Sequence, residues 1–209
     1  METRSKEELF NTLTHLAGVV FTLSTAYILL RLGYASNWRH AFGTTFFTCG
    51  MLLLYAASTL YHWCPPGRLK QRFRVLDHVS IYVMIAASYT PICIGIVGDT
   101  LGWVVFAVLW AVVLAGTVYK IAAIDRYPRL SLALYLVMGW TFVFIAGPVV
   151  QHVFRPALWC ILAEGAFYSS GTWFFAHDSR PWHHGIWHLF VLAGSVCHWV
   201  AILLILTHH

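Results

Sequence analysis

The sequence TLGWVVFAVLWAVVLAGTVY, residues 100–119, contains no charged side chain over twenty consecutive positions. An α-helix rises about 1.5 Å per residue, so a run of this length spans the roughly 30 Å hydrocarbon core of a bilayer. The run shows no alternation of polar and apolar residues of the kind that marks a half-buried strand. We therefore interpret residues 100–119 as a membrane-spanning helix.

Uncharged runs of similar length recur along the whole chain. Of its 209 residues, 59% are apolar and only 10% are charged, whereas a soluble domain carries about 25% charged residues. Lipid must therefore be the solvent for much of the surface. The further runs are Leu9–Leu30, His40–Gly67, His78–Gly98, Leu130–Phe154, Pro156–His177, which only Glu164 interrupts, and Pro181–His209.

These runs predict an all-α integral membrane protein with one domain, residues 1–209, and seven transmembrane helices. Backbone groups in lipid must be paired within the segment, and helices of this length pair them. The approximate helices are residues 12–31, 41–62, 75–97, 101–119, 130–150, 156–176 and 184–206.

The lysines and arginines lie in the gaps between the runs and indicate the topology. If the chain crosses the membrane seven times, ten of the thirteen lie on the same side of the membrane as the N-terminus: Arg4, Lys6, Arg68, Lys70, Arg72, Arg74, Lys120, Arg126, Arg129 and Arg180. The other three, Arg31, Arg39 and Arg155, fall on the opposite side. The positive-inside rule then predicts a cytoplasmic N-terminus and an external C-terminus. Because the cations form no basic face, the net charge of +5 does not indicate nucleic-acid binding.

Histidines from two predicted helices converge on the cytoplasmic end. His62 ends the second helix, and His184 and His188 open the seventh, four residues apart and hence on one helical face. Three neutral imidazoles with a fourth, open position form the catalytic kind of zinc site. Asp77 is predicted at the very start of the third helix, where it would orient a histidine or the bound water. Ser58 lies one turn deeper than His62.

Other interpretations of these histidines remain open. The pattern HxxxH is weak alone, and histidines at helix ends often bond loop carbonyls instead. Gly185 stands where the zinc-protease motif HExxH has its glutamate, so a general base must come from elsewhere, and Asp77 is the nearest candidate. The five cysteines contain no CxxC pair and indicate neither a disulfide framework nor a thiolate zinc site.

Three polar residues near the N-terminus, Glu8, Asn11 and His15, share one face of the first helix. They would either support the zinc site from behind or form a polar network between helices. His198, deep in the seventh helix, is expected to be a satisfied core histidine. Glu164 is expected to be protonated or hydrogen-bonded inside the bundle, or alternatively to line a lipid cavity. His78 should point away from the site. Glycines in the fifth and sixth helices predict close helix packing: Gly139, Gly147, Gly165 and Gly171.

Four segments resemble the hemolysin III family, the bacterial branch of the progestin and adiponectin receptor (PAQR) family. They are EELFNTLTH (Glu7–His15), ASTLYH (residues 57–62), LDHVSIYVMIAASYTP (Leu76–Pro91) and HGIWHLFVLAGSVCH (His184–His198). The resemblance runs from Glu7 to about Leu204. It implies seven helices, zinc on His62, His184 and His188, and Asp77 and Ser58 close to the metal-bound water. It also implies a bacterial inner (plasma) membrane. Glu164 belongs to no motif of that family.

Several functions fit this pattern. The first is a zinc-dependent hydrolase that cleaves a membrane lipid amide or ester, in the manner of the alkaline ceramidases with which the family is grouped. The second is a lipid-sensing or receptor-like protein in which zinc is structural. The third is a cytolytic pore former, which the lack of a continuous polar stripe on any helix disfavours. A haem protein would need paired histidines at mid-membrane depth, whereas most histidines here lie at helix ends.

Overall fold

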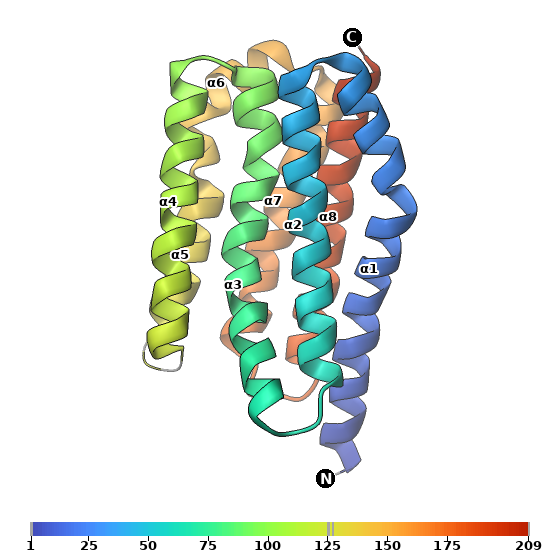
Figure 1. Cartoon of the computed structure of the whole chain (residues 1–209), viewed down its shortest axis with the longest axis vertical. Coiled ribbons are helices and arrows are strands. Elements are labelled where there is room, and N and C mark those ends of the chain that lie inside the picture. Colours follow the sequence, from blue (N-terminus) through green and yellow to red (C-terminus); the bar gives the residue numbers. More distant parts are fainter. Residues whose placement is uncertain (1, 125, 127, 209) are drawn as a thin grey trace.

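The computed structural model describes the backbone of residues 2–124, 126 and 128–208. Within these residues every regular element is a helix (Figure 1). Residues 1 and 209, which bound the predicted domain, and the side chain of Arg4 lie outside the described part. The elements are α1 (Glu2–Ser36), α2 (Trp38–Trp63), α3 (Arg68–Thr90), η1 (Pro91–Val97), α4 (Thr100–Ala123), α5 (Pro128–Trp140), α6 (Phe142–His152), α7 (Arg155–Ala176) and α8 (His183–Thr207).

Six helical segments of the described chain are long and apolar enough to cross a membrane. They are Lys6–Ser36, Trp38–Trp63, Arg68–Val97, Thr100–Ala123, Arg129–His152 and His183–Thr207. Helix α7 is also long, at 22 residues, but it is not one of these six segments. An integral membrane bundle of helices is thus confirmed, while the seventh crossing stays a prediction.

The third span continues through a proline. Pro91 has no N–H to donate to the preceding turn, and from this residue the helix widens into the π-helix η1. Gly98 then ends the span in the left-handed conformation, at φ 64°, and its N–H donates to the carbonyl of Cys93. The span begins at Arg68, earlier than the predicted residue 75.

The predicted helix 130–150 is divided by a break at Thr141 into α5 and α6. The hydroxyl of Tyr89 lies in this break, where it donates to the carbonyl of Gly139 and accepts the N–H of Phe142 at 2.8 Å. A side chain of α3 thus satisfies backbone groups that the interrupted helix leaves unpaired, which lipid could not do.

The N- and C-terminal ends of the chain lie at opposite ends of the bundle (Figure 1). Helices α2, α4 and α7 end, and α3 and α8 begin, at the N-terminal end. The four cations from Arg68 to Arg74 are at this end as well. Lys120 corrects the sequence prediction: it is not in a loop but in the last turn of α4, where it is buried and its Nζ lies 3.3 Å from Nδ1 of His78.

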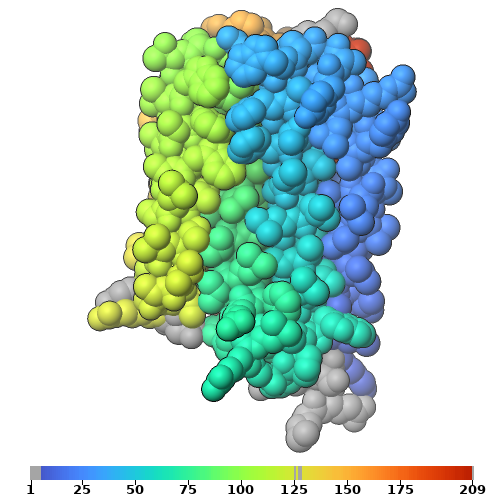
Figure 2. Space-filling view, in the orientation of Figure 1, coloured from blue at the N-terminus to red at the C-terminus, as the bar shows by residue number. Residues whose placement is uncertain are grey.

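The outer surface of the bundle is apolar. On α4, Leu114, Val118 and Ile121 recur at helical spacing and are each about 70% exposed, so they form one lipid-facing stripe (α4 is yellow-green in Figure 2). Helices α2 and α3 are the most buried of the spans. The buried core includes Phe47 and Tyr55 of α2 and Tyr82 of α3.

Candidate metal centre

The histidine cluster lies where α2 ends and α8 begins. His62 is in the last turn of α2, and His184 and His188 are in the first two turns of α8. Trp182, which precedes α8, has φ 66° and is the one non-glycine residue with positive φ in the described chain. Its N–H donates to Oε1 of Glu7 at 3.1 Å. This unfavourable conformation turns the chain abruptly into α8 and so fixes the start of the helix against α1.

The three histidines converge on one point. Each offers a ring nitrogen that lies within 4.8 Å of those of the other two. Ring centroids are 5.1 Å apart for His62 and either partner, and 4.7 Å apart for His184 and His188. A tetrahedral ion with Zn–N bonds of about 2.0–2.1 Å sets its ligands about 3.3 Å apart. Small side-chain rotations would therefore let this trio hold a metal ion.

Two imidazole nitrogens of the trio are buried and lack a partner within the described residues. They are Nε2 of His62 and Nε2 of His184. A buried polar atom without a partner is rare, because its desolvation is not compensated. A metal ion would satisfy both nitrogens at once, so the donor set fits one.

Helix α1 holds the Nδ1 atoms of His62 and His188. Nδ1 of His62 donates to Oε2 of Glu8 at 2.9 Å, and the same carboxylate accepts Nζ of Lys70 at 3.3 Å. Nδ1 of His188 lies 3.2 Å from the carbonyl of Asn11 and 3.1 Å from Oγ1 of Thr14. A histidine that donates through Nδ1 presents Nε2 to a metal. Sequence reasoning missed Thr14, which shares the face of Asn11 at three residues' distance.

His15 lies against the trio without joining it. Its ring stacks on that of His188, with centroids 3.6 Å apart, and both its nitrogens are buried without partners in the described part of the chain. The close approach of α1 to α8 depends on Gly185. A Cβ there would come within 2.8 Å of Oδ1 of Asn11 and closer still to the ring of Phe10. Glycine at this position thus brings α1 against the site.

Asp77 and Ser58 lie beside the trio. Asp77 is in the third turn of α3, not at the helix start as predicted, because α3 begins at Arg68. It is buried, faces His62, and lies outside the group of candidate ligands. Ser58 is fully buried next to Asp77, and its hydroxyl has no hydrogen-bond partner among the described residues. Asp77 and Ser58 thus lie where a molecule bound at the trio would meet them.

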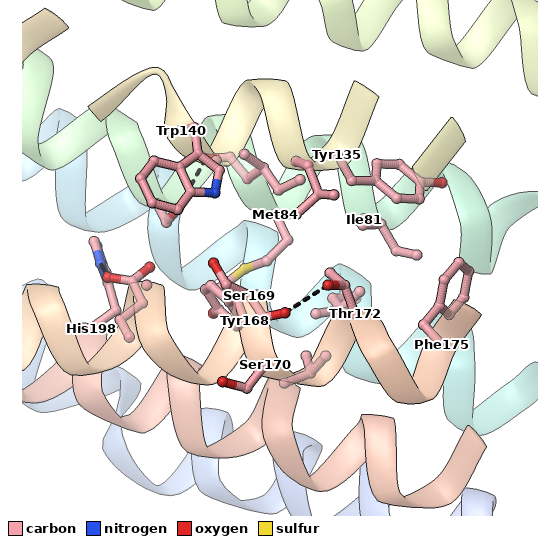
Figure 3. A pocket seen from close by; sticks show the side chains of 18 of the residues that line it. Ile81, Met84, Tyr135, Trp140, Tyr168, Ser169, Ser170, Thr172, Phe175 and His198 are labelled. Carbon is pink, nitrogen blue, oxygen red and sulfur yellow. Dashed lines mark hydrogen bonds and ion pairs between the residues drawn. The ribbon is translucent and has the colours of Figure 1, made fainter. Parts of the chain in front are cut away.

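A cavity of about 490 Å³ extends from the histidines into the bundle. At one end its wall includes Asp77, His184 and His188, and apolar side chains line most of the rest. In Figure 3, Ile81, Met84 and Trp140 lie on one side, with Tyr168 and Phe175 on the other. A cavity of this size and polarity fits a small molecule with a large apolar part.

The far end of the cavity carries a second polar pair. Nδ1 of His198 donates to Oε2 of Glu164 at 2.6 Å, and both residues are buried. Glu164 is thus hydrogen-bonded and also lines the cavity.

The predicted packing of three glycines is wrong. A Cβ at Gly139, Gly147 or Gly165 would meet nothing within 4 Å, and Gly139 and Gly165 line the cavity. Only Gly171 meets a neighbouring helix closely, at Phe190 and Trp187.

The fold and the site together define a multi-pass helical membrane protein with a candidate metal centre at one end of an apolar cavity. Comparison with known proteins identifies the family: the model of the "Haemolysin-III related" family matches residues 3–199. The chain belongs to this family, as its sequence motifs predicted.

Named relatives agree with this assignment. "Hemolysin-3 homolog" of Bacillus subtilis (strain 168) is 36% identical over 200 residues, covering 95% of this chain and 93% of that protein. "Hemolysin-3" of Bacillus cereus is 34% identical over 201 residues, covering 95% and 91%. "Heptahelical transmembrane protein ADIPOR2" of Oryza sativa subsp. japonica is 28% identical over 187 residues, covering 75% and 78%. The resemblance to PAQR-type proteins is thereby confirmed.

Proposed function

We propose that this protein is a zinc-dependent hydrolase that cleaves an amide or ester bond of a membrane lipid. The observation that carries the proposal is the position of the three histidines, which lie at one end of a largely apolar cavity with a buried carboxylate beside them. His62, His184 and His188 would hold the metal, and all three donors are imidazole nitrogens, which suit zinc. When bound, zinc would act as a Lewis acid and would lower the pKa of a bound water so that it loses its proton near neutral pH.

The side chains around the trio have separate roles in this proposal. Asp77 accepts a proton on its carboxylate and later returns it to the leaving group, as a general acid–base residue does. The hydroxyl of Ser58, which has no normal hydrogen bond, donates to the oxygen that gains negative charge. Glu8 and Asn11 hold the outer nitrogens of His62 and His188, so their rings keep one orientation.

A lipid substrate is favoured because the cavity reaches the surface that faces the membrane. Trp140, Val143 and Leu162 line the cavity and are also exposed, at 62%, 61% and 46%. Side chains that belong to both surfaces mark a lateral route, on the side of α5, α6 and α7. A lipid could then place its chain in the cavity and its polar linkage at the histidines without crossing water.

The same proposal places α7 as a seventh span, the N-terminus in the cytoplasm and the protein in the plasma membrane. With 22 residues, α7 would extend about 33 Å, enough to cross. An odd number of crossings agrees with termini at opposite ends of the bundle. The ten-to-three distribution of cations favours the cytoplasm for the end that holds the histidines.

The test combines metal analysis with a substrate assay. Purified wild-type protein should contain about one zinc per chain and should release fatty acid from a panel of lipid amides and esters in vesicles. His184→Ala/His188→Ala should lose both zinc and turnover. The control is His152→Ala, because this exposed histidine bonds the carbonyl of Pro148 in its own helix and is not one of the candidate ligands. Full zinc retention in the double variant would reject the metal site, and zinc without turnover on any lipid would favour the receptor-like alternative.

A further inference from the structure

The pair Glu164–His198 is not needed by the chemistry proposed at the histidine trio. Glu164 comes from α7 and His198 from α8, and the ring of His198 packs on Phe47 with centroids 4.6 Å apart. His198 lies 15 residues into a helix of 25, so the pair is deep within the bundle. Ionisable groups at such depth are costly in a membrane and therefore indicate function by default.

One nitrogen of this pair is available to a ligand. Nδ1 of His198 lies 2.6 Å from Oε2 of Glu164; when Nδ1–H donates to the carboxylate, a neutral ring carries its lone pair on Nε2. Nε2 is buried and has no partner among the described residues, although His198 is only 3% exposed. His198 also lines the cavity, at one end of the view in Figure 3. The cavity thus contains a hydrogen-bond acceptor that the protein itself leaves unpaired.

Open space adjoins this acceptor. Gly165, next to Glu164, lines the cavity, and a Cβ there would meet nothing within 4 Å. Thr172, another residue of α7 that lines the cavity, has its hydroxyl bonded to the carbonyl of Ser169 at 2.6 Å. His198 therefore has both the room and the unused capacity to bind a polar group of an occupant.

Helix geometry sets the distance between the two ends of the cavity. His188 and His198 are ten residues apart on α8, which corresponds to about 15 Å along the helix. An extended chain advances about 1.2 Å per bond, so about twelve bonds bridge this distance.

We propose that Glu164 and His198 form a second binding subsite, which accepts a hydrogen bond from a hydroxyl group on the apolar chain of the ligand, about twelve bonds from the group held at the histidine trio. The proposal rests on the proposed function in one respect, that a lipid chain occupies the cavity. An unsubstituted chain would leave Nε2 desolvated and unpaired. A site with such an acceptor discriminates against the analogue that lacks the hydroxyl.

The test compares 12-hydroxyoctadecanoate with octadecanoate, each displacing a fluorescent fatty acid from the purified full-length protein. Wild type should bind the 12-hydroxy acid about tenfold more tightly, and 2-hydroxyoctadecanoate should gain nothing. The double variant Glu164→Gln/His198→Phe removes the acceptor without stranding a charge and should bind both acids equally. Thr172→Val should keep the wild-type preference, because its hydroxyl is already bonded within α7.

The outcomes separate this subsite from the proposed hydrolase. Wild-type protein that keeps the preference but lacks zinc or turnover supports the subsite and counts only against the hydrolase. Equal binding of the two acids by wild type, or a preference that survives in Glu164→Gln/His198→Phe, overturns the subsite. Failure of wild type to bind either acid also overturns it. Unchanged octadecanoate affinity in the double variant shows that the fold is retained.

Discussion

Glu8 should control how tightly the histidine trio binds metal. Its Oε2 accepts Nδ1–H of His62 at 2.9 Å, which fixes the ring orientation and leaves Nε2 facing the other two histidines. Carboxylates in this position typically raise metal affinity about 10–100-fold, which corresponds to about 1.4–2.8 kcal/mol. We therefore expect Glu8→Ala to weaken zinc binding while the three candidate ligands remain.

The structure places the effect toward the lower part of that range. The Glu8 side chain is 32% exposed, so water screens its charge, and Lys70 at 3.3 Å shares the same oxygen. We expect a loss of about tenfold for Glu8→Ala. Glu8→Gln keeps an acceptor oxygen for His62 and loses only the charge, so its loss should be smaller, about threefold.

The assay is competition for zinc between the purified protein and a chelator of known affinity, at constant pH. Asp178→Asn is the matched control for charge, because Asp178 is an exposed acid in the α7–α8 connection, at the same end of the bundle. It should bind zinc like wild type. Wild-type affinity in Glu8→Ala would refute the reasoning that α1 positions His62. Equal losses of zinc affinity in Glu8→Ala and Asp178→Asn would mean that the effect comes from the net charge alone.

Three further predictions follow from the site and the fold. Asp77→Asn should retain zinc but lower hydrolytic turnover by roughly 10²–10⁴-fold, and a variant that keeps its zinc and fully complements a deletion strain would favour the receptor-like alternative. Gly185→Ala should destabilise the protein by about 1–3 kcal/mol, seen as a lower melting temperature in detergent, because its Cβ would collide with the ring of Phe10; an unchanged melting temperature would contradict this. A reporter fused after the last helix, beyond Thr207, should be active outside the cytoplasm, and a cytoplasmic signal would mean an even number of crossings.

Much of the helical architecture was readable from the sequence because lipid imposes a simple rule. Charged residues are excluded from the spans, so the uncharged runs outline the helices. The rule fails where a side chain takes the place of a backbone hydrogen bond within a helix, as Tyr89 does at the break between α5 and α6. No local sequence pattern indicates such a contact. It also misplaced Lys120, which is buried in α4 beside His78 instead of lying in a loop.

The histidine trio was predictable for a geometric reason. His184 and His188 are one helical turn apart, and alternation of helix direction brings the end of α2 to the same face of the membrane. The roles of Thr14 and Lys70 were not predictable, because each depends on the rotation of one helix against another. The cavity was missed for a related reason: Gly139 and Gly165 were expected to bring helices together, but in the structure they border open space.

These glycines bear on what the cavity is for. A Cβ at Gly139 or Gly165 would meet no atom within 4 Å, so alanine would fit at either position and fill part of the space. Filling a void usually stabilises a protein, and alanine also favours a helix over glycine. The protein instead combines open space with buried polar groups at both ends, the histidine trio with Asp77 at one and Glu164 with His198 at the other. Each of these features lowers stability in an empty bundle, and all of them become favourable when an elongated molecule with two polar groups occupies the cavity.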